Sequence, residues 1–223
     1  MQIDTSISQE RRGISNRSAS FSERRFERFL KRCLDFAGAV CLIVFLLPVY
    51  AIVGLLVLLD DGRPVFYRRR VLGMDGKFDA FKFRTMRPDA NEFLKDNPAL
   101  NAEFEENFKL KSDPRLTRIG PILRKYSLDE LPQLFNVLRG QMSLVGPRMI
   151  TAPELEKYGP FKDLLLSVRP GITGYWQVNG RQEVTYKERV AMDMLYIESW
   201  SLLWDLKILF LTPLKVIKRE GAY

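Results

Sequence analysis

The stretch FAGAVCLIVFLLPVYAIVGLLVLL, residues 36–59, contains no charged side chain and decides how the rest of the chain is arranged. As an α-helix it would extend about 36 Å, more than the roughly 30 Å hydrocarbon core of a bilayer. It begins too late and runs too long for a cleaved signal peptide. We therefore predict a membrane helix over this stretch.

Pro48 and the basic flanks bear on how this helix meets the membrane. Pro48 removes a backbone hydrogen bond near the middle of the stretch and is expected to kink the helix. Arginine and lysine flank the stretch on both sides, at 24–32 and 63–77, whereas positive charge normally marks only the cytoplasmic side of a span. Two basic flanks favour a re-entrant helix that enters and leaves by one face; a single-pass span is the alternative.

The remaining segments divide the chain into three parts. Residues 1–22 are rich in Ser, Arg and Gln and are predicted to form a disordered tail. Residues 23–62 join an amphipathic lead-in, with apolar side chains at helical spacing among cations, to the membrane helix. Residues 63–223 are expected to form a separate domain. Its last stretch, 200–221, suits an interfacial helix, and a core helix is the alternative.

Local patterns predict several elements of this domain. Residues 64–87 read as a β-hairpin with a turn at Gly-Met-Asp-Gly, 73–76. Residues 88–111 are predicted to be helical with a break near Asn97-Pro98, residues 131–139 to be a short helix stopped by Gly140, and residues 184–199 to be helical. Residues 168–183 are rich in turn formers. The expected fold class is a mainly helical α/β monotopic membrane protein.

Composition restricts the chemistry. The chain has no histidine, which excludes Ser-His-Asp triads, imidazole bases and His-ligated zinc. Its two cysteines, Cys33 and Cys41, exclude a disulfide framework. Lys and Arg number 35 against 27 for Asp and Glu, a net charge of +8, so an anionic partner is expected. Carboxylates, hydroxyls, cations and a hard metal ion remain for any catalysis.

The densest polar cluster is RKYSLDELP, residues 124–132, where two adjacent carboxylates, Asp129 and Glu130, stand near cations. Ser127 and Glu130 have the spacing of a helix capping box, and on spacing alone that structural role is favoured. Pro132 should make the first turn irregular. We expect Asp129 to stay ionised, because a helix N-terminus and Arg124 both favour its charged form. Such a carboxylate can bind Mg²⁺ or attack phosphorus.

Other candidates are weaker when taken singly. Arg148 follows a Gly-Pro turn and has the fork that suits bidentate phosphate contact, although surface arginines after turns are common. The loop RPGITGYWQVNGR, 169–181, could let a nucleotide approach closely, or could be a glycine-rich connection. Lys82 and Arg84 alternate with Phe on a strand, and Asp193 lies in a helix; both patterns are more often solvated polar faces.

Taken together, these motifs resemble the bacterial sugar transferase family, the monotopic polyprenyl-phosphate phosphoglycosyl transferases. The resemblance covers about residues 27–223 and rests on a membrane helix with a central Pro48 and on FKFRTM (81–86), SLDELPQLFNVLRGQMSLVGPR (127–148), RPGITGYWQVNGR (169–181) and DLKILFLTPLKVIKREGAY (205–223). It is greatest to exopolysaccharide-initiating members. The family often has Ser-Pro at the helix break, whereas this chain has Leu47-Pro48.

The resemblance implies a two-step phosphoryl transfer by a cytosolic catalytic domain, 63–223. Asp129 matches the nucleophile that attacks the β-phosphorus of a UDP-sugar and releases UMP, and Glu130 matches its dyad partner. Mg²⁺ would bridge Asp129 and the diphosphate, and Arg148 would bind phosphate. Further substrate or phosphate contacts are expected from the following residues, the last three of them in the loop that would meet nucleotide or sugar: Arg124, Lys82, Arg84, Asp193, Gln177, Asn179 and Arg181.

The implied acceptor is undecaprenyl phosphate, and the implied location is the cytoplasmic face of the bacterial inner membrane, among membrane lipid. Galactose 1-phosphate is the expected group, with glucose 1-phosphate the alternative; a homo-oligomer is left open. Three other functions were weighed. A transferase that moves the sugar alone would release UDP and often uses Asp-x-Asp, which the chain lacks. A non-catalytic scaffold would not need Asp129, Glu130 and Arg148. A nucleic-acid binder is not expected, because the cations are dispersed and no such motif occurs.

Overall fold

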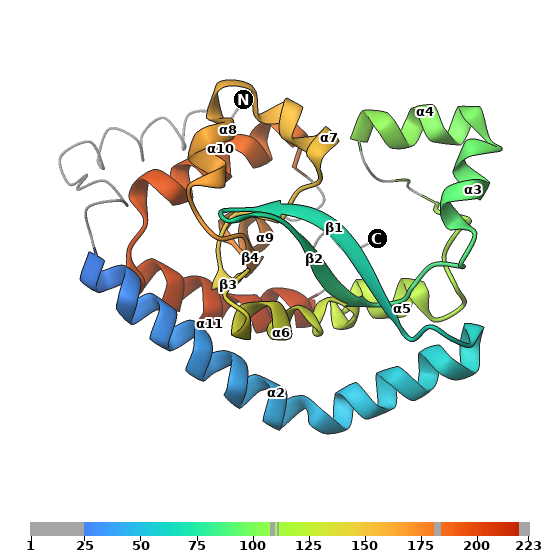
Figure 1. Cartoon of the computed structure of the whole chain (residues 1–223), viewed down its shortest axis with the longest axis horizontal. Helices are drawn as coiled ribbons and strands as arrows, with labels where there is room; N and C mark the ends of the chain where they lie inside the picture. The colour runs from blue at the N-terminus through green and yellow to red at the C-terminus, as the bar shows by residue number, and fades with distance from the viewer. Residues whose placement is uncertain (1–24, 108–109, 111, 181–183, 219–223) are drawn as a thin grey trace.

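The computed structural model describes residues 25–107, 110, 112–180 and 184–218 (Figure 1). The predicted tail, 1–22, lies outside these residues. The described chain is mainly helical, with two small sheets. Its elements run in this order: α2 (Arg25–Asp61), β1 (Phe66–Gly73), β2 (Gly76–Phe83), α3 (Ala90–Lys95), α4 (Pro98–Asn107), α5 (Gly120–Lys125), η1 (Leu128–Glu130), α6 (Gln133–Leu138), β3 (Ser143–Val145), α7 (Ala152–Leu155), η2 (Glu156–Phe161), α8 (Lys162–Leu166), β4 (Gly171–Thr173), α9 (Tyr175–Asn179), α10 (Tyr186–Ser199) and α11 (Leu202–Lys218).

Helix α2 contains the predicted membrane stretch. It runs for 37 residues with Pro48 inside it, and in the described part of the chain it is the one helix long and apolar enough to cross a membrane. Figure 1 shows it lying along one side of the molecule and changing direction along its length. Large apolar side chains of its middle, among them Val44, Phe45 and Leu47, are exposed. Apolar exposure of this extent is typical of a surface that faces lipid.

Both ends of α2 are attached to the domain that follows it. Near its start, Lys31 donates to Asp205 of α11 (2.6 Å), and Asp35 accepts from the backbone of Leu144 (2.9 Å). Just after Pro48, the Tyr50 hydroxyl donates to the carbonyl of Leu131 (2.6 Å). Just before the helix ends, Asp60 accepts from the backbone of residue 119 (3.1 Å). None of these hydrogen bonds involves the residues between Asp35 and Tyr50.

The predicted hairpin is confirmed. Strands β1 and β2 pair antiparallel from Phe66↔Phe83 to Gly73↔Gly76, and Gly76 at the turn has a φ of 105°, which favours glycine. Lys82 of β2 and Arg69 of β1 lie on the same face of the hairpin, because side chains alternate along each strand and Lys82 pairs with Tyr67, two residues before Arg69. Both side chains lie toward the rest of the domain and are largely shielded from solvent. The hairpin therefore supplies cations to the interior side of the sheet.

The glycine-rich motif, residues 169–181, contains strand β4 of the second sheet. Strand β3 pairs parallel with β4, through Ser143↔Gly171 and Val145↔Thr173. A Cβ atom at Gly171 would collide with the backbone of Gly146, and one at Gly146 would collide with the backbone of Arg169. Close backbone packing therefore requires glycine at both positions. Of the two roles predicted for the 169–181 loop, the glycine-rich connection accounts for Gly171. The close approach fixes the turn that carries Arg148.

A main core lies between the hairpin, α6, β3, α10 and α11, and a smaller one joins the end of α2 to β2 and α5. Fully buried members of the main core come from each of these elements and, in the case of Met142, from just before β3: Val71, Ala80, Val137, Met142, Val145, Met194, Ile197 and Ile208. The smaller core contains Val53, Val57, Phe83 and Leu123. The smaller core explains why the last turns of α2 stay packed against the domain.

The other predicted helices are confirmed with shifted ends. Helices α3 and α4 are separated at Asn97-Pro98, α6 ends before Gly140, and α10 covers most of 184–199. The turn-rich stretch 168–183 contains the short elements β4 and α9. Helix α11 contributes Ile208 to the main core, as the core-helix alternative predicts, while its Leu203 and Phe210 are each 78% exposed; whether it lies at a membrane interface stays a prediction.

Candidate active site

Asp129 and Glu130 lie in η1, a single 3-10 turn between α5 and α6. Ser127, just before it, has a φ of 55°, in the left-handed region, and makes no side-chain capping bond. The predicted Ser127–Glu130 capping box is therefore wrong: the left-handed residue turns the chain so that no regular helix follows. The irregular first turn expected from Pro132 is confirmed, since α6 begins only at Gln133. The strained turn directs both carboxylates inward, and Asp129 is 5% exposed.

Lys82 of β2 holds the two carboxylates. Its Nζ lies 2.6 Å from Glu130 Oε1 and 3.5 Å from Asp129 Oδ2. Arg148 approaches from the other side, with Nη1 3.8 Å from Glu130 Oε1. Three separate segments of the chain thus place two acids and two cations together.

The surroundings shift the pKa values of the two carboxyl groups in opposite directions. Burial raises the pKa of Asp129 above its ordinary value, against the attraction of Lys82. Burial alone would also raise the pKa of Glu130, but Lys82 and Arg148 lower it to about 2. The expectation that a helix N-terminus keeps Asp129 ionised is corrected, since η1 is too short to provide a helix dipole.

Arg148 is positioned by the second sheet and by aromatic side chains. It follows the Gly146-Pro147 turn after β3 and bridges to Gly171 in parallel fashion. Its guanidinium carbon lies 5.7 Å from the centre of the Trp176 ring, within the range of a cation–π contact. The planar group is therefore held at a defined orientation beside the carboxylates.

Behind Arg148 lies a buried cluster that includes Asp193. The Tyr158 hydroxyl donates to Asp193 Oδ2 (2.8 Å), and Arg189 Nε lies 3.9 Å from the same oxygen. Arg189 also lies over the Trp176 ring, at 5.1 Å. Burial raises the pKa of Asp193 to about 6, although Arg189 and Tyr158 favour its charged form. The predicted site residue Asp193 thus supports Trp176 and Arg148 from behind.

Sequence reasoning missed Arg69, Arg189, Tyr158 and Trp176 as members of this group. Arg69 Nη2 pairs with Glu154 Oε2 at 3.2 Å, on the inner side of β1. Strand alternation could have separated Arg69 from its exposed neighbours in the Arg68–Arg70 run. The i, i+4 spacing of Arg189 and Asp193 was likewise a usable signal, because such residues share a helix face.

Other predicted residues lie elsewhere or have internal partners. The Arg84 guanidinium is bound to Asp61 and to the carbonyls of Pro64 (2.6 Å) and Gly62 (2.8 Å), so it fastens the end of α2 rather than joining the carboxylates. Arg124 Nε donates to Thr85 Oγ1 (3.1 Å) while its charge acts on Asp129. Arg181 lies outside the described residues.

Two amides of the 169–181 loop are also engaged within the chain. Gln177 Nε2 donates to the Ile172 carbonyl (2.9 Å), and Asn179 Nδ2 donates to the Tyr175 carbonyl (2.9 Å). Their structural role is to hold β4 and α9 in place. A substrate contact from either side chain would therefore involve its amide oxygen or its second N–H.

The described residues contain no group of three or more His, Cys, Asp or Glu side chains arranged to hold a metal ion. Mg²⁺ nevertheless needs only one or two carboxylates when substrate phosphates and water complete its shell. Asp129 fits such a role, because Lys82 stands 3.5 Å away, outside hydrogen-bond distance, and leaves the carboxylate oxygens open to a further ligand. Glu130, held closely by Lys82, is the less suited of the two.

Comparison with known proteins places these features in a family. The bacterial sugar transferase family matches residues 26–219. The chain is 48% identical over 94% of its length to the UDP-galactose-lipid carrier transferase of Erwinia amylovora, covering 44% of that protein. It is 45% identical over 86% of its length to the exopolysaccharide production protein ExoY of Sinorhizobium fredii, covering 88% of it.

The UDP-glucose:undecaprenyl-phosphate glucose-1-phosphate transferase of Escherichia coli is 38% identical over 88% of the chain and 42% of that protein. The chain spans less than half the length of the first and third of these relatives. Because the match covers the apolar helix, the dyad and Arg148 alike, the chain belongs to the bacterial sugar transferase family.

Proposed function

We propose that the chain transfers a hexose 1-phosphate from a UDP-sugar to undecaprenyl phosphate, as a first membrane step of exopolysaccharide synthesis. The observation that carries this proposal is the Asp129–Glu130 pair beside Lys82 and Arg148. Relatives named for galactose support galactose 1-phosphate as the group transferred. The relative named for glucose 1-phosphate makes glucose the alternative.

The proposed reaction has two displacements at phosphorus. A carboxylate oxygen of Asp129 attacks the β-phosphorus, the bond from that phosphorus to the bridging oxygen breaks, and UMP leaves with the bridging oxygen. The phosphate oxygen of undecaprenyl phosphate then attacks the same phosphorus and breaks its bond to Asp129. The carboxylate is regenerated, and neither step requires an external oxidant or reductant.

The cations around the dyad serve this chemistry by position and charge. Phosphoryl transfer depends mostly on positioning and on stabilising charge on the phosphoryl oxygens. Arg148, fixed over Trp176, suits a bidentate contact to the donor phosphates, and Lys82 keeps Glu130 ionised next to the nucleophile. Mg²⁺, when held by Asp129, would neutralise diphosphate charge. The cations also favour the ionised form of Asp129 that the attack requires.

We propose in addition that α2 is re-entrant and that the domain lies on the cytoplasmic face of the inner membrane. Support comes from the attachment of both ends of α2 to one domain, through Lys31 and Asp35 near its start and through Asp60 and Asp61 at its end. A straight span would carry its two ends to opposite faces of the bilayer. This arrangement also brings a water-soluble donor and a lipid-borne acceptor to the same boundary.

A terminal tag tests this topology. In spheroplasts, whose outer surface is the periplasmic face, tags at either end should both resist protease until the membrane is opened. Digestion of one tag in intact spheroplasts would establish a single-pass span and contradict the re-entrant arrangement.

The reaction is tested with UDP-galactose labelled in the β-phosphate. The full chain, purified in detergent and given donor with Mg²⁺ but no lipid, should retain label on protein after acid quenching. Asp129→Asn should lose the label, whereas Asp75→Asn, at the exposed tip of the hairpin, should keep it. With lipid phosphate present, UMP should be released.

The outcomes separate the alternatives. Release of UDP instead of UMP would support a sugar-only transferase. No nucleotide release with UDP-galactose or UDP-glucose would support a non-catalytic scaffold. Label that Asp129→Asn retains would remove Asp129 from the proposed role.

A further inference from the structure

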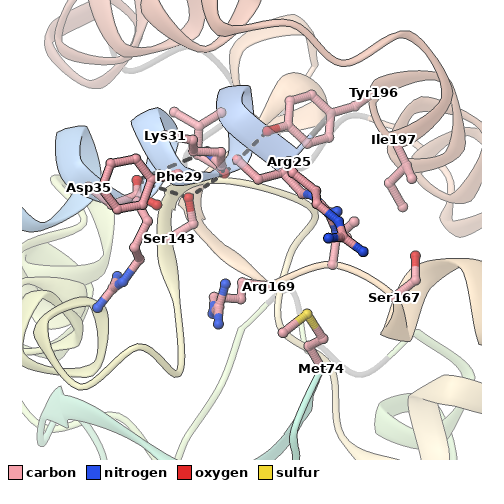
Figure 2. Close-up of a pocket in the computed structure, with 14 residues that line it drawn as sticks. Arg25, Phe29, Lys31, Asp35, Met74, Ser143, Ser167, Arg169, Tyr196 and Ile197 are labelled. Atoms are coloured by element: carbon pink, nitrogen blue, oxygen red, sulfur yellow. Dashed lines mark hydrogen bonds and ion pairs between the residues drawn. The ribbon is translucent and has the colours of Figure 1, made fainter. Parts of the chain in front are cut away.

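A cavity lies away from the dyad, against the start of α2. It has a volume of about 300 Å³ and is bounded by the first turns of α2, by β3, by α10 and by the residues that follow α8. Figure 2 shows side chains from these segments, among them Lys31, Ser143, Arg169 and Tyr196, around this space. None of its lining residues is Asp129, Glu130, Lys82 or Arg148. It is therefore a site that the proposed transfer reaction does not use.

The cavity carries an excess of positive charge. Asp35 is its one acidic lining residue among those described, and it accepts from Ser143 Oγ (3.0 Å) and from the Leu144 backbone (2.9 Å). Lys31 is paired with Asp205 behind the cavity. The basic side chains that line the cavity are Arg25, Arg28, Lys31, Arg32 and Arg169. Without Lys31 and Arg28, which interact with other groups of the chain, Arg25, Arg32 and Arg169 still outnumber the one lining carboxylate, and this excess favours an anion.

Arg32 and Arg169 indicate where in the cavity an anion would bind. Arg32 Nη2 donates to the Leu138 carbonyl (3.2 Å) and Arg169 Nε to the Gly140 carbonyl (2.6 Å), so both guanidinium groups are anchored at the end of α6. These partners are neutral, and within the described chain neither arginine is paired with a carboxylate. Arg32 Nη1 is buried and has no hydrogen-bond partner there. A buried charged donor without an acceptor is costly, and an anion in the cavity would supply one.

The apolar part of the lining identifies the kind of anion. Phe29 lines the cavity and is 67% exposed, and it continues the exposed apolar face formed by Phe26 and Leu30 on the first turns of α2. The same helix leads directly into the membrane stretch. A ligand with an anionic head and an apolar chain would meet arginines with its head and Phe29 with its chain.

We propose that this cavity binds the phosphate of a membrane lipid, between Arg32 and Arg169, with the lipid chain against Phe29. The inference depends on α2 lying at a membrane but not on the transfer reaction, because it shares no residue with the dyad. Bulk phospholipid and a polyprenyl phosphate have the same chemistry at this site. The bound lipid would hold the start of α2 at the boundary where its amphipathic turns leave the hydrocarbon.

Native mass spectrometry of the full chain in a neutral detergent tests the proposal. Phosphatidylglycerol, phosphatidylcholine and farnesyl phosphate are titrated separately, with inorganic phosphate as competitor. We expect adducts with phosphatidylglycerol or farnesyl phosphate at concentrations at least tenfold below those for phosphatidylcholine, and the tighter of the two identifies the source. Equal binding of phosphatidylcholine, or displacement of lipid by equimolar inorganic phosphate, would overturn a lipid-phosphate site.

Charge variants locate the adduct. Arg169→Gln should weaken it about tenfold, as expected for loss of one charge-assisted contact, and Arg169→Lys should weaken it less. Arg118→Gln, which removes an exposed charge outside the cavity, should leave it unchanged. An equal effect of Arg169→Gln and Arg118→Gln would contradict the site.

A second variant covers the case in which Arg169→Gln unfolds. Arg25 is exposed at the cavity and has no hydrogen bond or ion pair within the described chain, so Arg25→Gln should preserve the thermal midpoint. We expect it to weaken phosphatidylglycerol binding about threefold. Unchanged binding in a folded Arg25→Gln variant, together with an Arg169→Gln variant that binds normally or does not fold, would reject the proposal.

Discussion

Lys82 Nζ lies 2.6 Å from Glu130 Oε1, which joins the hairpin to the turn that carries the candidate nucleophile. The same ammonium group stands 3.5 Å from Asp129, so one side chain compensates two neighbouring buried carboxylates. A buried acid that loses its partner is strongly destabilising, because its desolvation is no longer offset. Lys82 is therefore expected to serve both stability and the proposed chemistry.

Lys82→Met should lower the free energy of unfolding by about 3–5 kcal/mol, the usual cost of breaking a buried ion pair from one side. It should also reduce UMP release by about 10²-fold or more, since a preorganised charge contact is lost. Lys77→Met, on the same strand but exposed, is the matched control and should change neither quantity. Thermal melts and donor assays on the two proteins check this, and similar behaviour of both would contradict the role of Lys82.

Arg148→Lys should reduce kcat/KM for the donor by about tenfold or more, although the charge is kept. Lysine cannot present the planar fork that contacts two phosphate oxygens and lies over the Trp176 ring. Arg139→Lys provides a control, because Arg139 lies over Phe81 at 4.8 Å in a comparable contact without belonging to the site. Steady-state UMP release is measured for both variants. Equal losses of kcat/KM in Arg148→Lys and Arg139→Lys would mean that the contact with the aromatic ring, rather than a phosphate contact, explains the loss.

Asp193 should make stability depend on pH. Its folded pKa of about 6 exceeds the ordinary value of 3.8, so between these values the folded chain holds a proton that the unfolded chain has lost. Its contribution is therefore fully present below about pH 4 and is lost as pH rises through about 6. The difference corresponds to about 3 kcal/mol.

Asp193→Asn should remove this component. Thermal midpoints measured from pH 4 to pH 8 should decline less in the variant than in the parent chain as the pH rises to about 6. Asp75→Asn, which replaces an exposed aspartate, should follow the parent curve. Parallel curves for the parent and Asp193→Asn would show that Asp193 does not titrate in this range.

Lys31 and Asp205 should stabilise each other. Asp205 accepts from Lys31 (2.6 Å), from the Tyr196 hydroxyl (2.7 Å) and from Trp200 Nε1 (3.0 Å), so it joins α2 to the end of α10. Either Lys31→Met or Asp205→Asn should lower the free energy of unfolding by about 3 kcal/mol. The double variant should lose clearly less than the sum of the two, because the lone charge is then absent.

The control for this cycle is Lys207→Met, which removes an exposed cation from α11. It should leave the thermal midpoint unchanged and should add independently to Asp205→Asn. Additive losses for Lys31→Met and Asp205→Asn would show that the pair is not energetically coupled.

Much of the local structure was predictable because it depends on short-range rules. The uncharged run at 36–59 requires a long helix, the glycines at 73 and 76 require a hairpin turn, and Pro98 requires a helix break. The Asp129–Glu130 pair could be recognised from its neighbours along the chain. The capping box could not be excluded in this way, because no neighbouring residue signals that Ser127 is left-handed at the junction between α5 and η1.

Partner choice was decided only by tertiary structure. Lys82 and Arg84 have the same strand pattern, yet Lys82 meets the dyad whereas Arg84 fastens the end of α2. Arg148 and Asp193 belong to one cluster because the Trp176 ring contacts both Arg148 and Arg189, and Arg189 pairs with Asp193. Periodicity assigns a side chain to a face of its own element, but the energy of a buried charge depends on what packing brings opposite that face. The sequence therefore specified the elements and the candidate dyad, while the contacts among distant segments determined which cations surround it.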